Sequence, residues 1–188
     1  NGANPLRVTD KLEDALSSFS PDSSKLVFST YRWGDRRNRI FYVWTDEQNR
    51  RAWEWGAGGL YGEDPAWLAN GEIVYRTSWP DNQLWIMSGD ATNQRPFFAT
   101  NNSISALAGS PDSTAVAYQG LIDAGSNWDI YTVDIATGQA QRLTTDDAQD
   151  GLPAFAPDGQ SIAFVSDRGG SWGLWVMDRD GANQRRIL

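Results

Sequence analysis

The sequence contains no cysteine and no histidine among its 188 residues. Without histidine, the chain cannot assemble a Ser-His-Asp or Cys-His catalytic group from its own residues. Zinc, copper, haem-type and iron–sulfur sites lose their usual ligands as well, which leaves oxygen-ligated metals such as Ca²⁺ or Mg²⁺. We assign no catalytic residue, no metal site and no cofactor to this chain, and an oxygen-ligated metal is the one kind of metal that its composition leaves open.

Basic residues and long apolar runs are also scarce. The chain has 16 Lys and Arg against 24 Asp and Glu, a formal net charge of −8. Nucleic-acid affinity comes largely from Lys and Arg, so we expect no nucleic-acid partner. The longest purely apolar run is residues 40–44, far short of the ~20 residues of a membrane helix, so we expect no membrane insertion.

The expected location is extracytoplasmic, either periplasmic or secreted. The chain begins at Asn1 rather than Met, as it would after removal of a leader. The absence of cysteine also fits an extracytoplasmic protein that avoids disulfide chemistry, although it fits a cytosolic protein almost as well.

What the sequence does contain is a pattern that occurs four times. Each copy has a turn followed by a short hydrophobic segment, in residues 19–28, 67–75, 109–118 and 155–164. With Pro21, Ala69, Pro111 and Pro157 taken as equivalent, the steps are 48, 42 and 46 residues. Steps of this size are typical of the blades of a β-propeller.

Each copy has a second half built on another short run of β-branched and aromatic residues. These runs are residues 40–43, 84–87, 130–133 and 174–177. They indicate strands, and no helical period accompanies them. With a flanking strand on either side, each copy predicts an antiparallel meander of four strands, a to d, in which Pro-Asp-Ser or Pro-Asp-Gly forms the a–b turn.

These motifs resemble the WD40-like PD40 repeat of TolB-type proteins, which also occurs in the propellers of tricorn-like and prolyl-oligopeptidase-like enzymes. The best copy spans residues 152–181, with Pro157-Asp158-Gly159 at the a–b turn. The resemblance implies an all-β fold, a β-propeller of four four-stranded antiparallel blades. Four blades form either an unusually small closed propeller or part of a larger one.

The expected blades are residues 10–55, 56–99, 100–144 and 145–188. Residues 1–9 resemble the turn and last strand of a blade, so we assign them to the outer strand of a preceding blade or to a closure strand. An unclosed stack would expose sheet edges and an apolar blade face, which predicts self-association.

The lengths of the connections differ between the two faces of the predicted propeller. From the turn position to the end of strand b the spacing is 7, 6, 7 and 7 residues, and from the start of c to the end of d it is 13 in every copy. The b–c gaps are 12, 9, 12 and 10 residues. Variable loops on one face favour a recognition surface there; drift in unselected loops is the alternative.

The candidate partner-binding residues lie in the b–c and d–a segments. Trp and Arg are typical of binding hot spots, and acidic residues accompany them: Arg32, Trp33, Arg36, Arg37, Tyr61, Asp64, Trp79, Asp147 and Asp150. Internal ion pairs between the arginines and the acids are the competing interpretation. Trp128 and Trp172 precede strand c by two residues, which favours packing between blades. The cluster Asp146, Asp147 and Asp150 is a weak Ca²⁺ candidate.

The function predicted first is a non-catalytic scaffold that binds a protein or peptide through the b–c and d–a face. The resemblance to TolB-type repeats implies an interaction role in the envelope or outside the cell. Two alternatives stay open: a substrate-gating propeller of a serine peptidase whose catalytic domain lies outside this chain, and a carbohydrate-binding module.

Overall fold

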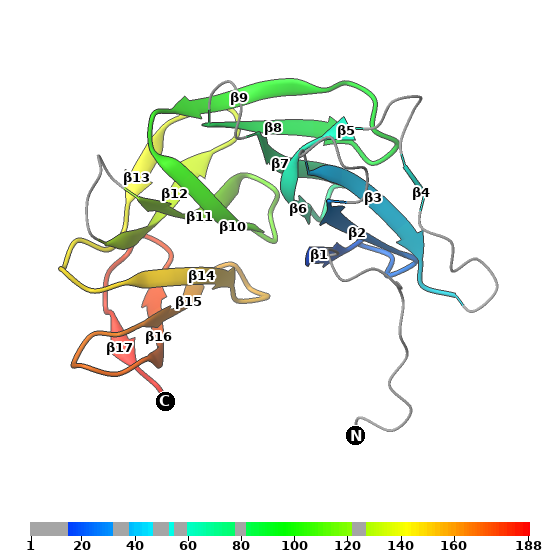
Figure 1. The fold of residues 1–188 in the computed structure, drawn as a ribbon. Coiled ribbons are helices and arrows are strands. Elements are labelled where there is room, and N and C mark those ends of the chain that lie inside the picture. The colour runs from blue at the N-terminus through cyan, green and yellow to red at the C-terminus, as the bar shows by residue number, and fades with distance from the viewer. Residues whose placement is uncertain (1–14, 32–37, 47–52, 55–59, 78–81, 122–126) are drawn as a thin grey trace.

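The computed structural model describes residues 15–31, 38–46, 53–54, 60–77, 82–121 and 127–188. These residues form seventeen β-strands and no helix. The strands make four separate antiparallel sheets that follow one another around an arc, with the first and last sheets at its ends (Figure 1). The predicted all-β propeller architecture is confirmed, and no helix that could cross a membrane occurs in the described ranges.

We number the sheets as blades 1 to 4 in chain order. Blade 1 consists of β1 (Ala15–Phe19), β2 (Lys25–Thr30), β3 (Arg39–Trp44), β4 (Trp53–Glu54) and β5 (Leu60–Tyr61). Blade 2 consists of β6 (Glu63–Trp67), β7 (Glu72–Thr77), β8 (Asn82–Ser88) and β9 (Arg95–Thr100). Blade 3 consists of β10 (Ser103–Gly109), β11 (Ala115–Leu121), β12 (Trp128–Asp134) and β13 (Ala140–Arg142). Blade 4 consists of β14 (Asp150–Phe155), β15 (Ser161–Ser166), β16 (Gly173–Asp178) and β17 (Arg185–Arg186).

The first blade departs from the plain meander. Its short strand β5 pairs with β3, beside β4, so that Leu60 lies opposite Ile40. Sequence spacing assigns residues 56–61 to the second blade, whereas the pairing places β5 in the sheet of the first. Like β4, β5 runs antiparallel to β3, so β3 pairs with both segments before the chain enters β6.

The a–b turns share one construction in all four blades. The side chains of Asp22, Asn70, Asp112 and Asp158 each accept a hydrogen bond from the backbone N–H two residues later, at 3.0–3.1 Å. The residue between has a positive φ in each turn: Ser23, Gly71, Ser113 and Gly159. Asn70 performs the task of the aspartate in the second blade, which explains why that blade keeps the turn without the Pro-Asp pair.

Contacts between blades confirm the expected separation of the two faces. On one face, which we call the turn face, Arg179 of the blade 4 c–d turn binds Asp112 of the blade 3 a–b turn at 2.6 Å. On the other, the loop face, Asn127 before β12 donates a hydrogen bond to the carbonyl of Asp146 before β14 at 2.9 Å. The a–b and c–d turns therefore meet at one side, and the b–c and d–a loops meet at the other.

The innermost strand of every blade carries a β-bulge at the same place. The register of β1, β6, β10 and β14 shifts there, and the first bulged residue has a positive φ of 51–54°: Leu16, Asp64, Ala106 and Leu152. These four residues line one cavity of about 370 Å³. The bulges bend the innermost strands around the centre of the arc.

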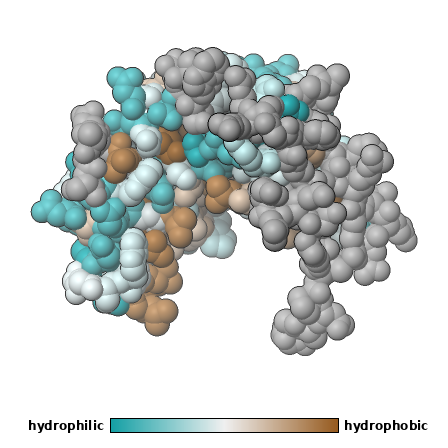
Figure 2. Space-filling view, viewed as in Figure 1, coloured by the Kyte–Doolittle hydropathy of each residue, from teal (hydrophilic) through white to brown (hydrophobic). Residues whose placement is uncertain are grey.

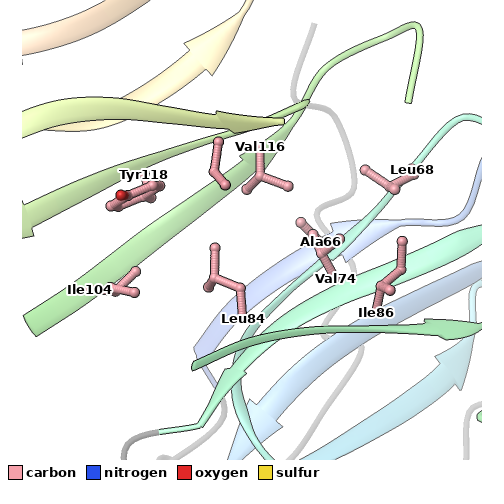
Figure 3. Packing of buried hydrophobic residues seen from close by; sticks show 9 residues of the cluster. Ala66, Leu68, Val74, Leu84, Ile86, Ile104, Val116 and Tyr118 are labelled. Atoms are coloured by element: carbon pink, nitrogen blue, oxygen red, sulfur yellow. The ribbon is translucent and has the colours of Figure 1, made fainter. Parts of the chain in front are cut away.

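Apolar clusters form at each junction between blades. The largest contains Leu68, Leu84 and Ile86 of blade 2 and Val116 and Tyr118 of blade 3 (Figure 3). Similar clusters join blades 1 and 2 and blades 3 and 4. Burying one such side chain contributes roughly 1.5–3 kcal/mol, so every blade depends on its neighbours for its core.

Candidate functional site

The structure describes four of the nine residues predicted to bind a partner. Tyr61, Asp64, Asp147 and Asp150 lie within the described ranges. The remaining five lie outside them: Arg32, Trp33, Arg36, Arg37 and Trp79. The site can therefore be built from the second, third and fourth blades and from β5.

Tyr61 lies at the surface, as a partner-binding aromatic should. It ends β5 and is 42% exposed. The guanidinium carbon of Arg39 lies 5.0 Å from its ring centroid, and Arg39 Nη2 donates a hydrogen bond to the Tyr61 hydroxyl at 3.4 Å. The pair forms a cation–aromatic surface patch beside strand β3.

Asp64 lies beneath the loop face rather than on it. It is 3% exposed, and its Oδ2 accepts hydrogen bonds from Arg76 Nε at 2.8 Å and from the backbone N–H of Ala106 at 3.0 Å. Arg76 also pairs with Glu63. Because Asp64 occupies the bulge of β6, its carboxylate points across to the bulge of blade 3 and ties the two innermost strands together.

Asp150 is buried as well, whereas Asp147 is exposed. Asp150 Oδ2 and Asp146 Oδ2 each lie 2.7 Å from Arg168 Nη2. Arg168 also lies over the ring of Trp175, with its guanidinium carbon 4.8 Å from the centroid. Asp146 and Asp150 thus form internal ion pairs with Arg168. The sequence interpretation did not single out this arginine.

A third buried carboxylate lies close to this group. Asp129 is 1% exposed and binds Arg142 Nη2 at 2.7 Å. Burial raises the pKa of Asp129, against the lowering effect of Arg142, and the negative charge of Asp150 raises it further. The junction of blades 3 and 4 therefore concentrates buried charge on the side of the loop face.

A pocket of about 440 Å³ lies beside Asp150. Trp128 and Trp172 form part of its lining, together with Gln119, Asp150, Leu152 and Val165. Trp172 is 61% exposed. The described residues therefore do not bury it between blades, although its spacing before strand c favours such packing. The sequence pattern of one tryptophan in each b–c segment was the available signal for this pocket.

Three buried carboxylates near the loop face are held in ion pairs. The carboxylates that could serve as acids, bases or metal ligands are engaged by Arg76, Arg142 and Arg168. Within the described ranges, no group of three or more Asp or Glu side chains is placed to hold a metal ion. What the loop face presents is an aromatic pocket, an exposed tyrosine and acidic loops.

A family model described as the TolB beta propeller domain, PD40, matches residues 65–188. The chain belongs to the TolB β-propeller family. The matched segment begins within β6 of blade 2 and runs through blade 4, so it includes Asp129, Asp146, Asp150 and the pocket but not Asp64. The chain is thus a propeller scaffold of the TolB type.

Two curated relatives share about half of the chain. An uncharacterized protein of Agrobacterium fabrum is 36% identical over 98 residues, which are 52% of this chain and 33% of that protein. The Tol-Pal system protein TolB of Francisella tularensis is 33% identical over 90 residues, 47% of this chain and 20% of that protein. The matched region therefore spans a third or less of the length of these relatives.

Solved structures share the fold over nearly the whole chain. A putative TolB from Agrobacterium tumefaciens superposes with a TM-score of 0.76 at 22% identity, covering 96% of this chain and 64% of that one. A puromycin-hydrolyzing peptidase of Mycobacterium tuberculosis superposes with a TM-score of 0.70 at 10% identity, covering 93% of this chain and 29% of that one. The fold is thus found both in TolB and within a peptidase.

Proposed function

We propose that this TolB-type propeller is a non-catalytic scaffold that binds a protein or peptide through its loop face, in an extracytoplasmic compartment. The observation that carries the proposal is the contrast between the faces. The turn face is built from one Asx turn repeated in every blade. The loop face carries the exposed Tyr61, the acidic loop at Asp147 and the tryptophan pocket. Loops that differ from blade to blade on a rigid scaffold are the usual location of binding residues.

Photo-crosslinking from the two faces tests this proposal. The photoreactive residue p-benzoylphenylalanine replaces Tyr61 or Asp147 on the loop face, and Asp22 or Asp90 on the turn face, in the organism that encodes the chain. We expect adducts with one protein from the loop-face positions and none with it from the turn-face positions. Adducts of equal yield from both faces, or none from the loop face, would contradict the proposal.

A second candidate function is a substrate-gating propeller within a serine peptidase. The similarity of fold to the puromycin-hydrolyzing peptidase favours it. A peptidase needs a nucleophile and a base that this chain does not supply, since it has no histidine. Sequencing of the parent gene decides this alternative: an α/β-hydrolase segment with a G-x-S-x-G motif supports the peptidase, and its absence removes it.

Self-association is a further part of the proposal. The exposed large apolar side chains lie in or beside the end blades: Leu16, Phe19, Tyr31, Tyr61, Leu152, Trp172, Ile187 and Leu188. Apolar residues gather at the end of the arc formed by blade 4 (Figure 2). Sedimentation or light scattering should show a dimer of the unmodified chain. The variants Phe19→Ser or Leu188→Ser should convert it to a monomer. A monomer at every concentration would contradict it.

A further inference from the structure

The pocket at the junction of blades 3 and 4 has walls from both blades and from the connecting loops. Gln119 lies on β11, Trp128 on β12 and Leu152 on β14, while Trp172 lies in the loop between β15 and β16. Leu152 and Trp172 are each 61% exposed. Two indole rings and an aliphatic side chain therefore surround an opening that faces outward from the loop face.

Hydrogen bonds between the blades hold the walls in place. Gln119 Oε1 accepts from the backbone N–H of Leu152 at 3.0 Å, and Gln149 Oε1 accepts from the backbone N–H of Trp128 at 3.2 Å. Asn127 donates to the carbonyls of Asp146 and Ala148 at 2.9 and 3.2 Å. A pocket pre-formed in this way binds without first ordering its own loops.

A buried carboxylate at the floor of the pocket has a hydrogen bond to only one of its two oxygens among the described residues. Asp150 has no exposed surface, and its Oδ2 binds Arg168 at 2.7 Å. Its Oδ1 has no hydrogen-bond partner among the described residues. An unsatisfied buried acceptor is unfavourable, so a donor or a positive charge brought close to this floor is favoured.

The loops around the pocket are acidic overall. Asp146, Asp147 and Asp167 lie on them and Asp150 begins β14, against the guanidinium groups of Arg168 on the loop and of Arg186 on β17, which donates to the carbonyl of Trp172. The whole chain carries a formal charge of −8. The electrostatic potential at the opening therefore favours a cationic group.

We propose that this pocket binds a basic side chain of the protein partner, with its aliphatic part against Leu152 and Val165 and its charged group over the indole rings. Tryptophan is the best aromatic partner for a cation, and arginine also stacks flat on it. The negative loops add attraction that a neutral side chain would not feel. The inference rests on the proposed function, because it names the group of the partner that this face recognises.

Short peptides test the recognition directly on the 188-residue chain. The probe is acetyl-Ala-Arg-Ala-amide, and its matched control replaces arginine with citrulline, which keeps the shape and removes the charge. Indole N–H signals in ¹H–¹⁵N spectra report binding, and the variants Trp128→Phe and Trp172→Phe assign the two signals of the pocket. We expect both signals to shift with the arginine peptide, and the citrulline peptide to bind about tenfold more weakly.

Variants locate the site within the pocket. Trp172→Ala removes one wall and should weaken the binding of the arginine peptide about tenfold, whereas Phe19→Ala, an equally exposed aromatic on blade 1, should leave it unchanged. Asp150→Asn keeps the shape of the floor and should weaken binding. Should Asp150→Asn fail to fold, Asp147→Asn removes a loop charge at an exposed position, and a loss of about two- to threefold is expected.

Several results would overturn the inference. These are equal affinity for the arginine and citrulline peptides, unchanged affinity in Trp172→Ala, or shifts of the two indole signals with chitotriose but not with the arginine peptide, which would identify a carbohydrate site. Photo-crosslinking from Tyr61 and Asp147 separates this failure from failure of the proposed function. Adducts retained in Trp172→Ala leave partner binding by the loop face intact while removing this pocket from it.

Discussion

Blades 2 and 3 differ from blades 1 and 4 in what they leave uncovered. Each inner blade packs against a neighbour on both sides, and the cluster between them includes nine buried residues. Every large apolar side chain that is exposed among the described residues belongs to an end blade, its flanking residues or β5. The junction between the inner blades is therefore closed, whereas the exposed large apolar side chains belong to blades 1 and 4. Blade 1 also holds a buried cluster of its own, formed by Phe28, Phe41 and Val43.

The difference shows that a blade is not an independent unit of stability. In repeat proteins, stability is approximately a sum of the contribution of each repeat and of its interfaces with neighbours. Among the described residues, an inner blade shares apolar clusters with two neighbouring blades, whereas blades 1 and 4 each share one with a neighbouring blade. Substitutions of the same type should therefore cost more in the middle of the arc than at its ends or on its surface.

The largest effect is expected for the buried ion pair of blade 2. Arg76→Met leaves Asp64, 3% exposed, without its cation, and loss of one partner of a buried pair costs about 3–5 kcal/mol. Arg179→Met is the matched control, because its partner Asp112 has a side chain that is 47% exposed and exposed pairs contribute about 0–1 kcal/mol. Urea unfolding of both variants measures the difference. Equal losses would show that Asp64 is hydrated in solution.

The next largest loss of stability is expected at a buried leucine, with an exposed leucine for comparison. Leu84 in the cluster of blades 2 and 3 has no exposed surface, whereas Leu16 in blade 1 is 49% exposed. Leu84→Ala should cost about 2–5 kcal/mol through lost burial and the cavity that remains. Leu16→Ala should cost less than about 0.5 kcal/mol, as surface substitutions usually do. If Leu16→Ala proves as costly as Leu84→Ala in urea titrations, the Leu16 side chain is covered in solution.

The features that could be predicted from sequence are those with a fixed local chemistry. The a–b turn needs a side-chain acceptor and a residue that tolerates positive φ, so Pro157-Asp158-Gly159 and its copies indicate the turns and the blade period. The turns and the strands that follow them lie where the spacing places them. The separation into a turn face and a loop face follows from the antiparallel meander alone, and the inter-blade contacts of Arg179 and Asn127 agree with it.

The buried site depends on features that have no shared sequence signal. The bulges occupy Leu16, Asp64, Ala106 and Leu152, which have no chemistry in common, so the register shift cannot be recognised from any one of them. That shift directs the Asp64 carboxylate inward, toward Ala106. Asp150 and Arg168 meet only after β14 and β15 pair, 18 residues apart in the chain. Binding by Arg32, Trp33, Arg36 and Arg37 of the first b–c loop and by Trp79 of the second stays a prediction.

The bulges provide a smaller test, because they are the feature that inner and end blades share. Ala106 adopts a φ of 54°, which is unfavourable for a residue with a Cβ and free of cost for glycine. Ala106→Gly should therefore stabilise the chain by up to about 1 kcal/mol. Ala115→Gly, at an ordinary strand position of the same blade, should destabilise it by roughly 0.5–1 kcal/mol. Thermal unfolding compares the two, and a loss in Ala106→Gly would mean that the methyl group contributes packing.

The smallest effects are expected in the pH dependence of the free energy of unfolding. An exposed acid of blade 1 should make stability rise with pH, whereas a buried acid of blade 3 should make it fall. Hydrogen bonds from Ser20 and Ser24 lower the pKa of Asp22 to about 2, so its contribution is present above pH 4 and is lost as the pH falls toward 2. Burial raises the pKa of Asp129 above its usual 3.8. The folded state then holds this proton more tightly than the unfolded state, and stability falls as the pH rises from about 4 through the raised pKa.

Urea midpoints measured from pH 2.5 to 7 should therefore separate the two residues. Asp22→Asn should flatten the rise in stability below pH 4, and Asp129→Asn should flatten the fall above it. A profile that keeps its fall above pH 4 in Asp129→Asn would assign that fall to another group. The junction of blades 3 and 4 would then hold Asp129 as a fully paired anion, and the opposite pH dependence of Asp22 and Asp129 would disappear.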